Sequence, residues 1–286
     1  MVRSKSDTVF DCVVVVFIVL VGLVCLIPIL YVVSVSLTPI EEKMRAGGFL
    51  LFPKKVTFSA YKSVLSGKEF LPALWVSCKL TVIGTAMNLI ATLLFAYPLS
   101  RTNLPGRKVI MKLVIFTMIF NAGMIPTYLV VKQVKLLNTF WSMIIPSLVS
   151  VYNFIIMKSF FEGLPNDLFE SARIDGAGEM TILLKLVLPL SLPIIMTISL
   201  YYAVDHWNTY LRAVLYVSKD ELQPLQVVLR RLLKTNASAD ILSEEIIPTE
   251  TLQMANVVLA TLPVVVIYPF IQKYFVKGTL AGAVKG

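Results

Sequence analysis

The sequence has little charge for its length. Asp, Glu, Lys and Arg together make up 15% of the 286 residues, whereas 57% are hydrophobic, and the mean hydropathy is +0.81. A soluble globular domain carries about 25% charged residues. The composition therefore excludes an ordinary soluble domain and predicts a protein embedded in a membrane.

Residues that bind metals or form nucleophile–base pairs are also scarce. His206 is the only histidine, and Cys12, Cys25 and Cys78 show no paired spacing, which predicts neither a disulfide framework nor a metal site. The fragment Ser66-Gly-Lys-Glu69 lacks the upstream glycine and the final hydroxyl of a phosphate-binding loop. The net charge of +9 comes without a basic stripe interleaved with aromatics, which argues against nucleic acid. We expect no catalytic residue and no metal or cofactor bound by this chain.

Long apolar segments recur along the chain. A helix needs about 20 apolar residues to cross roughly 30 Å of hydrocarbon. The first segment is too long for a signal-peptide core, and no convincing small-residue cleavage site follows it, so we expect a retained helix. The expected spans are Val9–Val35, Trp75–Leu99, Val109–Val131, Thr139–Met157, Leu186–Ala203 and Leu252–Phe275. They predict an all-α, multi-pass membrane protein with six transmembrane helices in a single domain of residues 1–286.

Basic residues mark one side of the membrane. Arg3 and Lys5 precede the first span, Arg101 and Arg107 lie after the second, and Lys277 follows the last. Cytoplasmic loops are enriched in Lys and Arg, so both termini are expected in the cytoplasm, as six crossings require.

Residues 205–251 are then expected on the outer side. Within them Pro224 is followed by leucines and valines at helical spacing, with Arg230 and Arg231 between them, which predicts a short amphipathic helix that could lie on the bilayer surface. The stretch Asn236–Asp240 is typical of an exposed loop.

A polar segment, Leu164–Ala177, separates the fourth and fifth expected spans. Asp167 and Glu170 have the spacing of a capping box, and Gly176 suits the left-handed position that ends a helix, so a short helix around Leu168–Ile174 is expected. By spacing alone, a solvated connector explains this segment as well as a docking surface does.

The fuller pattern resembles the EAA loop of ABC importer permeases. Glu170-Ser-Ala is followed after three residues by Gly176, after nine more by Leu186, and after one more by Leu188-Pro189. Ser171 replaces the common second alanine, and Asp175-Gly-Ala177 matches the form found in sugar transporters. The chain also resembles the maltose-type permeases outside this loop, as in Trp207-Asn-x-Tyr210, and within them the branch for complex oligosaccharides.

This resemblance implies the type I importer fold, with residues 164–189 as a cytoplasmic coupling loop in the bacterial inner membrane. It implies a second, usually non-identical permease subunit, two ATP-binding subunits that carry ATP and Mg²⁺, and an extracytoplasmic binding protein that the helix after Pro224 would approach. The residues implied in ATPase coupling are Glu170, Ser171, Ala172, Asp175, Gly176, Ala177, Leu188 and Pro189. The implied function is ATP-driven import of oligosaccharides. A permease for another solute is the alternative, because the loop reports the ATPase and not the cargo.

Polar and aromatic groups at membrane depth are the candidates for contact with sugar, because they are costly in lipid. The candidates are Tyr152, Asn153, Trp207, Asn208 and Tyr210. An interfacial aromatic belt explains the group around Trp207 equally well. For Asn88 and Asn121 we expect interhelical hydrogen bonds rather than contact with a ligand.

Overall fold

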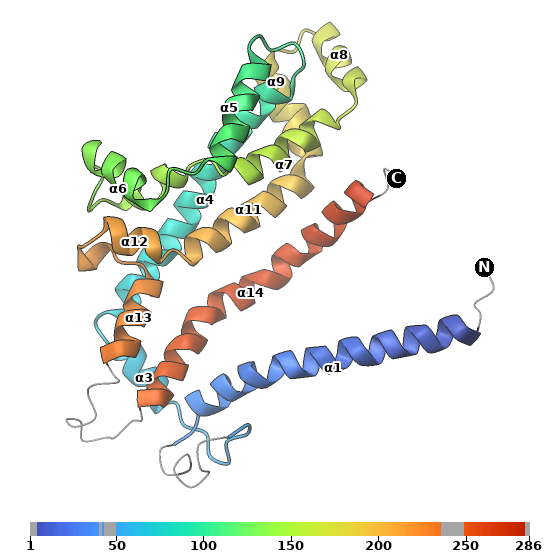
Figure 1. The fold of residues 1–286 in the computed structure, drawn as a ribbon. Coiled ribbons are helices and arrows are strands. Elements are labelled where there is room, and N and C mark those ends of the chain that lie inside the picture. Colours follow the sequence, from blue (N-terminus) through green and yellow to red (C-terminus); the bar gives the residue numbers. More distant parts are fainter. Residues whose placement is uncertain (1–4, 40–41, 43–49, 236–248, 284–286) are drawn as a thin grey trace. The chain divides into compact units, whose positions relative to one another are not determined.

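The computed structural model describes residues 5–39, 42, 50–235 and 249–283, and every regular element in these residues is a helix (Figure 1). The expected loop Asn236–Asp240 lies outside them. The chain divides into two compact units, Met1–Leu71 with Leu229–Pro263 and Pro72–Val228 with Val264–Gly286. Each is described by itself.

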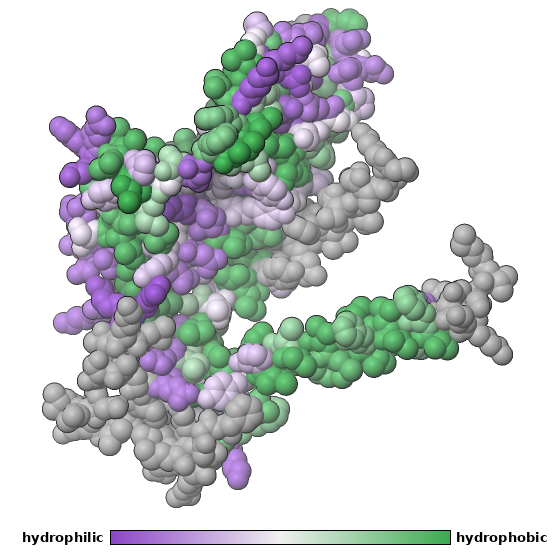
Figure 2. Space-filling model, in the orientation of Figure 1, coloured by the Kyte–Doolittle hydropathy of each residue, from purple (hydrophilic) through white to green (hydrophobic). Residues whose placement is uncertain are grey.

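The first unit contains α1 (Lys5–Ser36), whose side chains from residue 9 to residue 30 are exposed and almost all apolar. Figure 2 shows this as continuous hydrophobic surface. Among the described residues, the end of α1 is bonded to other elements: the Tyr31 hydroxyl donates to Glu250 of α14 (Thr249–Ala283) at 3.0 Å, and the Ser36 hydroxyl lies 2.6 Å from that of Tyr61 in α3 (Ser59–Ser66). Because apolar surface of this extent is unstable in water, α1 fits a lipid environment.

Most of the other helices belong to the second unit. Two short 3₁₀ turns, Phe140–Met143 and Ile145–Ser147, precede α7, and a π-helical turn, Leu183–Val187, joins α9 to α10. The helices are α4 (Phe70–Ser100), α5 (Arg107–Ile119), α6 (Met124–Gln133), α7 (Val151–Glu162), α8 (Asn166–Ile174), α9 (Glu179–Ile182), α10 (Leu188–Leu190), α11 (Leu192–Trp207) and α12 (Leu211–Tyr216), with a further 3₁₀ turn at Asp220–Leu222. The helix α13 (Leu225–Thr235) begins in the second unit and ends in the first.

Among the described residues, three helices are long and apolar enough to cross a membrane, in the ranges Val9–Ser36, Phe70–Ser100 and Glu250–Ile267. Three further pairs reach this length only together, because each is bent at a short break. They are Arg107–Ile119 with Met124–Gln133 (117°), Phe140–Ser147 with Val151–Glu162 (52°), and Glu179–Leu190 with Leu192–Trp207 (83°).

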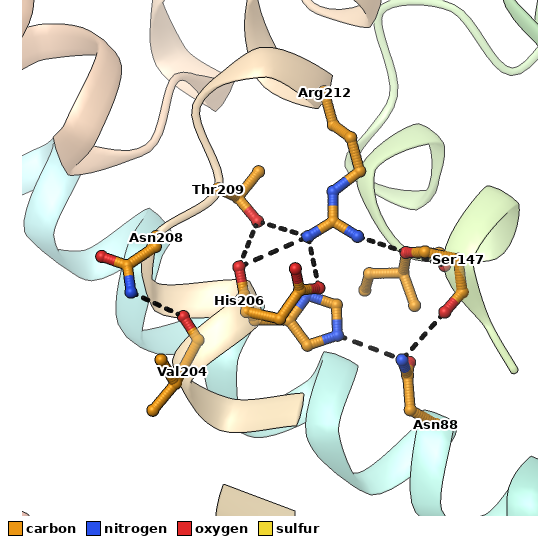
Figure 3. A network of polar contacts seen from close by, with 9 residues as sticks. Asn88, Ser147, Val204, His206, Asn208, Thr209 and Arg212 are labelled. Carbon is orange, nitrogen blue, oxygen red and sulfur yellow. Dashed lines mark hydrogen bonds and ion pairs between the residues drawn. The ribbon is translucent and has the colours of Figure 1, made fainter. Parts of the chain in front are cut away.

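The break before α7 is held by polar side chains of neighbouring helices. The buried Asn88 of α4 donates from Nδ2 to the Ser147 carbonyl at 3.0 Å (Figure 3). The Ser150 N–H donates to the Tyr202 hydroxyl of α11 at 3.0 Å, and that hydroxyl lies 2.7 Å from Thr92 Oγ1 of α4. These contacts replace backbone bonds that an interrupted helix cannot make. The interhelical hydrogen bond expected for Asn88 is confirmed.

The bend between α5 and α6 is organised locally instead. Gly123 has a φ of 84°, and its N–H donates to Asn121 Oδ1 at 2.8 Å. The interhelical hydrogen bond expected for Asn121 is therefore wrong: the side chain closes its own turn, as Asn commonly does.

The amphipathic helix expected after Pro224 is confirmed as α13. Leu225 and Val228 are buried, and the Leu225 N–H donates to the Ser77 hydroxyl of α4 at 2.8 Å. These apolar side chains are thus packed against the chain itself, which leaves them unavailable to a bilayer surface.

A hydrophobic cluster joins the end of α4 to α7, α8, α9 and α11. Its buried members are Ala96, Tyr97, Leu99, Phe154, Met157, Phe161, Phe169, Ile182, Leu183, Val187, Ile198 and Tyr202. Because Phe169 belongs to α8, this cluster fixes α8 against the end of α4.

Gly84 lets α4 and α11 approach closely. A Cβ at Gly84 would lie 2.5 Å from His206 Nε2, and the His206 ring is fully buried.

We expect Gly84→Ala to destabilise the protein by about 1–3 kcal/mol through overpacking, more than the ~0.5–1 kcal/mol that Ala gains over Gly in a helix. Thermal unfolding in detergent would measure this. Gly22→Ala is the matched control, because nothing lies within 4 Å of its added Cβ; an equal shift in both variants would contradict the prediction.

Candidate functional site

The polar segment between α7 and α9 folds into α8, which begins two residues earlier than expected. Pro165 occupies the position before the helix, and no side chain caps this end. Asp167 is therefore the second helical residue and Glu170 the fifth, so the predicted capping box is wrong. Proline, preset for an extended-to-helix transition, starts the helix without it.

The end of α8 is as expected. Gly176 has a φ of 76°, its N–H donates to the Arg173 carbonyl at 3.0 Å, and the Ala177 N–H donates to the Ala172 carbonyl at 2.9 Å. This pair of bonds is a Schellman motif, which needs a residue that tolerates the left-handed conformation. Ala172 and Ala177 both pack against the hydrophobic cluster, which makes the turn a well-defined structure.

The residues implied in coupling fall into two groups. Glu170, Ser171, Asp175, Gly176 and Pro189 are exposed. Ala172, Ala177 and Leu188 are partly buried and pack against the hydrophobic cluster. Of these two neighbouring small residues, Ser171 is therefore on the exposed surface, whereas Ala172 attaches α8 to the hydrophobic cluster.

A cleft of about 430 Å³ lies between α8 and the end of α4. Charged side chains of both signs line it: Arg101, Glu162, Glu170 and Arg173. Glu162 is paired with Arg107 and, at 2.7 Å, with Lys158. The cleft therefore combines internal ion pairs with the exposed carboxylate of Glu170.

Glu179, at the start of α9, links α8 to α4. Arg173 donates from Nη2 to Glu179 Oε1 at 2.8 Å, and the Tyr97 hydroxyl donates to Glu179 Oε2 at 2.6 Å. The hydrogen bond to Glu179 raises the pKa of the Arg173 guanidinium. Sequence reasoning missed Tyr97 and Glu179, because their pairing joins residues 82 positions apart.

The candidates for contact with sugar are placed differently from one another. Tyr152 is 57% exposed, with its ring centre 6.5 Å from that of Tyr201, whereas Asn153 and Trp207 are only 5% and 7% exposed. Tyr210 is half-buried. Sequence reasoning missed Tyr201, although the criterion that selected Tyr152, an aromatic group at membrane depth, applies to it as well.

An exposed polar face runs along the end of α11. Tyr201, Asp205 and Asn208 follow at spacings of four and three residues, which places them on one side of the helix. Asn208 Nδ2 donates to the Val204 carbonyl at 2.9 Å. Because exposed polar groups are costly in lipid, this face fits a water-filled path or a protein contact.

Arg212 of α12 fixes this end of α11. It pairs with Asp205 at 2.6 Å, donates to Thr209 Oγ1 at 2.9 Å, and donates to the Ser147 hydroxyl at the break before α7 (Figure 3). His206, 3.4 Å from Asn88 Oδ1, extends the network to α4. The polar face of α11 and the break before α7 are thus one connected structure.

These features define an integral membrane protein. Its helices expose apolar surfaces, its bent spans are stabilised by internal polar groups, and a small polar helix, α8, lies between α7 and α9. Residues 3–281 match the family described as the binding-protein-dependent transport system inner membrane component. The chain belongs to this family, as the EAA-like loop implied, and is a transport permease rather than an enzyme.

Its relatives agree over nearly the whole chain. It is 43% identical to the polygalacturonan/rhamnogalacturonan transport system permease protein YtcP of Bacillus subtilis (strain 168), with 98% of this chain and 100% of the relative covered. It is 42% identical to protein LplC of the same strain, with 99% and 97% covered. A solved bacterial ABC transporter involved in the import of the acidic polysaccharide alginate is similar with a TM-score of 0.88 and 33% identity, covering 96% of this chain and 99% of that chain.

Gly176 provides a test of the turn after α8. Gly176→Ala forces a Cβ into the left-handed region at a cost of about 1–2 kcal/mol, so amide exchange around Ala177 should be at least about fivefold faster. Hydrogen–deuterium exchange of the peptides around this turn would measure it. Gly178→Ala is the control, because Gly178 has a φ of −73° and nothing near its added Cβ. Equal exchange in the two variants would contradict a role for the positive φ.

Proposed function

We propose that the chain is one half of the membrane pathway of an ATP-driven, binding-protein-dependent importer of oligosaccharides in the bacterial inner membrane. The observation that carries this proposal is α8, a short polar helix anchored on one side and exposed on the other, in a chain that belongs to a permease family. Such a helix is suited to receive a force from a partner protein.

The proposed topology has six spans with both termini in the cytoplasm. Three single helices and three bent pairs provide the crossings, and the short link after α4 carries Arg101, Arg107 and Lys108 without an acidic residue, as cytoplasmic loops commonly do. This assignment places α8 and the link between α4 and α5 on the same, cytoplasmic side. The contact of Arg101, in this link, with the ring of Phe169 in α8 supports it, because it brings those two segments together.

The partners of α8 would be the two ATP-binding subunits, which carry ATP and Mg²⁺. Glu170, Ser171 and Asp175 are exposed and offer carboxylates and a small side chain to a partner surface. A second permease subunit would complete the pathway, and an extracytoplasmic binding protein would deliver the cargo near residues 205–251.

The proposed path for the sugar runs along the polar face of α11 and past Tyr152. Tyr152 and Tyr201 present two neighbouring exposed rings, and aromatic faces suit the C–H faces of sugar rings. Asp205 and Asn208 continue the same side of α11 with hydrogen-bonding groups. A relative named for polygalacturonan/rhamnogalacturonan transport, together with the structure named for alginate import, supports an oligosaccharide as the cargo.

The cargo is tested by the ATPase activity of the purified complex. With its binding protein, oligogalacturonides or other oligosaccharides should stimulate ATP hydrolysis several-fold, and amino acids should not. Uptake of the labelled compound into proteoliposomes provides the second measurement. Stimulation by amino acids alone would replace the oligosaccharide assignment with the alternative, a permease for another solute.

The role of α8 is tested by Glu170→Lys. Reversing a carboxylate at a docking surface commonly costs about 2 kcal/mol or more, so sugar-stimulated ATPase activity and uptake should fall roughly thirtyfold while membrane insertion is unchanged. Glu170→Asp should restore part of both. Lys108→Glu, at an exposed position of α5, is the control for altered cytoplasmic charge. Unchanged stimulation in Glu170→Lys would count against coupling through α8.

A further inference from the structure

Arg101, which follows the last residue of α4, lies between two aromatic rings. Its guanidinium carbon is 3.3 Å from the ring centre of Phe169 in α8 and 4.9 Å from that of Tyr97 in α4. Its Nε and Nη2 atoms are buried and have no hydrogen-bond partner among the described residues. The cation is therefore stabilised here by ring faces, on which a planar guanidinium stacks well.

Phe169 is the residue of α8 that is buried, with 2% of its surface exposed. The neighbouring Glu170 and Ser171 are exposed. A displacement of α8 as a body must therefore move Phe169, and with it the guanidinium that covers the ring.

A second connection runs beside the first. Arg173 of α8 pairs with Glu179, and Glu179 accepts the Tyr97 hydroxyl, so Tyr97 contacts both the carboxylate and the guanidinium of Arg101. Tyr97, Arg101, Phe169, Arg173 and Glu179 thus form a closed ring of contacts from α4 through α8 to α9. Such a ring resists rotation of α8 about any single contact.

We infer that Arg101 is a positioning residue that passes movement of α8 to α4, so that the helix carrying Asn88 responds to the ATPase cycle. This rests on the proposed coupling role of α8. From Ser100 to Asn88 the axis of α4 covers about 18 Å, and Asn88 holds the Ser147 carbonyl at the break before α7. Contacts recorded in the structure therefore connect α8 to the broken span that borders the polar face of α11.

If Arg101 only covered Phe169, different substitutions would be tolerated at this position. Any long side chain with an apolar stem can cover Phe169, so leucine would then replace arginine without loss. Only a planar cation interacts with both rings at once, and lysine, a compact charge, can keep just part of this interaction. The order of activities among arginine, lysine and leucine at this position separates the two roles.

The experiment uses the complete transporter with its binding protein in proteoliposomes, comparing Arg101→Leu, Arg101→Lys and Tyr97→Phe with the wild type. The measured quantity is sugar imported per ATP hydrolysed, alongside co-purification of the ATP-binding subunits. We expect Arg101→Leu to lower this ratio about fivefold, because it removes the cation from both ring faces. Arg101→Lys should fall between leucine and the wild type. Tyr97→Phe, which removes one oxygen atom and keeps the ring, should lower the ratio about twofold to threefold through loss of the bond to Glu179.

Lys108→Leu is the control, because it removes a cytoplasmic positive charge outside the ring of contacts and should leave the ratio unchanged. A normal ratio in Arg101→Leu would overturn the inference. So would loss of the ATP-binding subunits from Arg101→Leu together with a normal ratio in Tyr97→Phe, because Arg101 would then serve docking alone. A wild-type complex that imports no sugar would refute the proposed function itself, whereas a normal ratio in the variants of an importing complex refutes only the role of Arg101.

Discussion

Inside a bilayer every backbone group that leaves a helix must find a partner within the protein, and this constraint accounts for the polar side chains that surround the break before α7. The break before α7 exposes the Ser147 carbonyl and the Ser150 N–H, which bind Asn88 and Tyr202. Thr92 in turn shares the Tyr202 hydroxyl. A bent span is therefore stable because other helices supply polar groups at the same depth.

This requirement gives α4 a role at several levels of the second unit. Gly84 makes room for His206, Asn88 and Thr92 serve the break, and Tyr97 joins Glu179. These contacts lie along one continuous helix, so the arrangement of the break and the position of α8 are not independent. The residues of α4 at these positions therefore depend on the backbone of neighbouring segments as well as on the surrounding lipid.

Local features were predictable from the sequence, and long-range ones were not. Gly176 ends α8 as expected, because a positive φ depends on one residue type, and the pattern after Pro224 identified α13 because helical spacing is local. The predicted start of α8 was wrong. The spacing of Asp167 and Glu170 fitted a capping box, but the helix begins directly after Pro165 without a side-chain cap. The contacts of Tyr97 and Arg101 depend on how α4, α8 and α9 pack. From the sequence, Arg101 was predicted only to be one of several basic residues on the cytoplasmic side.

A helix can transmit force only if its attachment is stiffer than the contact it makes with a partner. At one end α8 follows Pro165, whose φ is fixed, and at the other the Schellman turn at Gly176 replaces a flexible connection with two backbone hydrogen bonds. Phe169 holds its middle in the hydrophobic cluster. Because Pro165 and Gly176 fix the two ends of α8 and Phe169 fixes its middle, a displacement at Glu170 or Ser171 moves the helix as one body. The same sequence features that end α8 sharply thus make it suitable as a rigid lever.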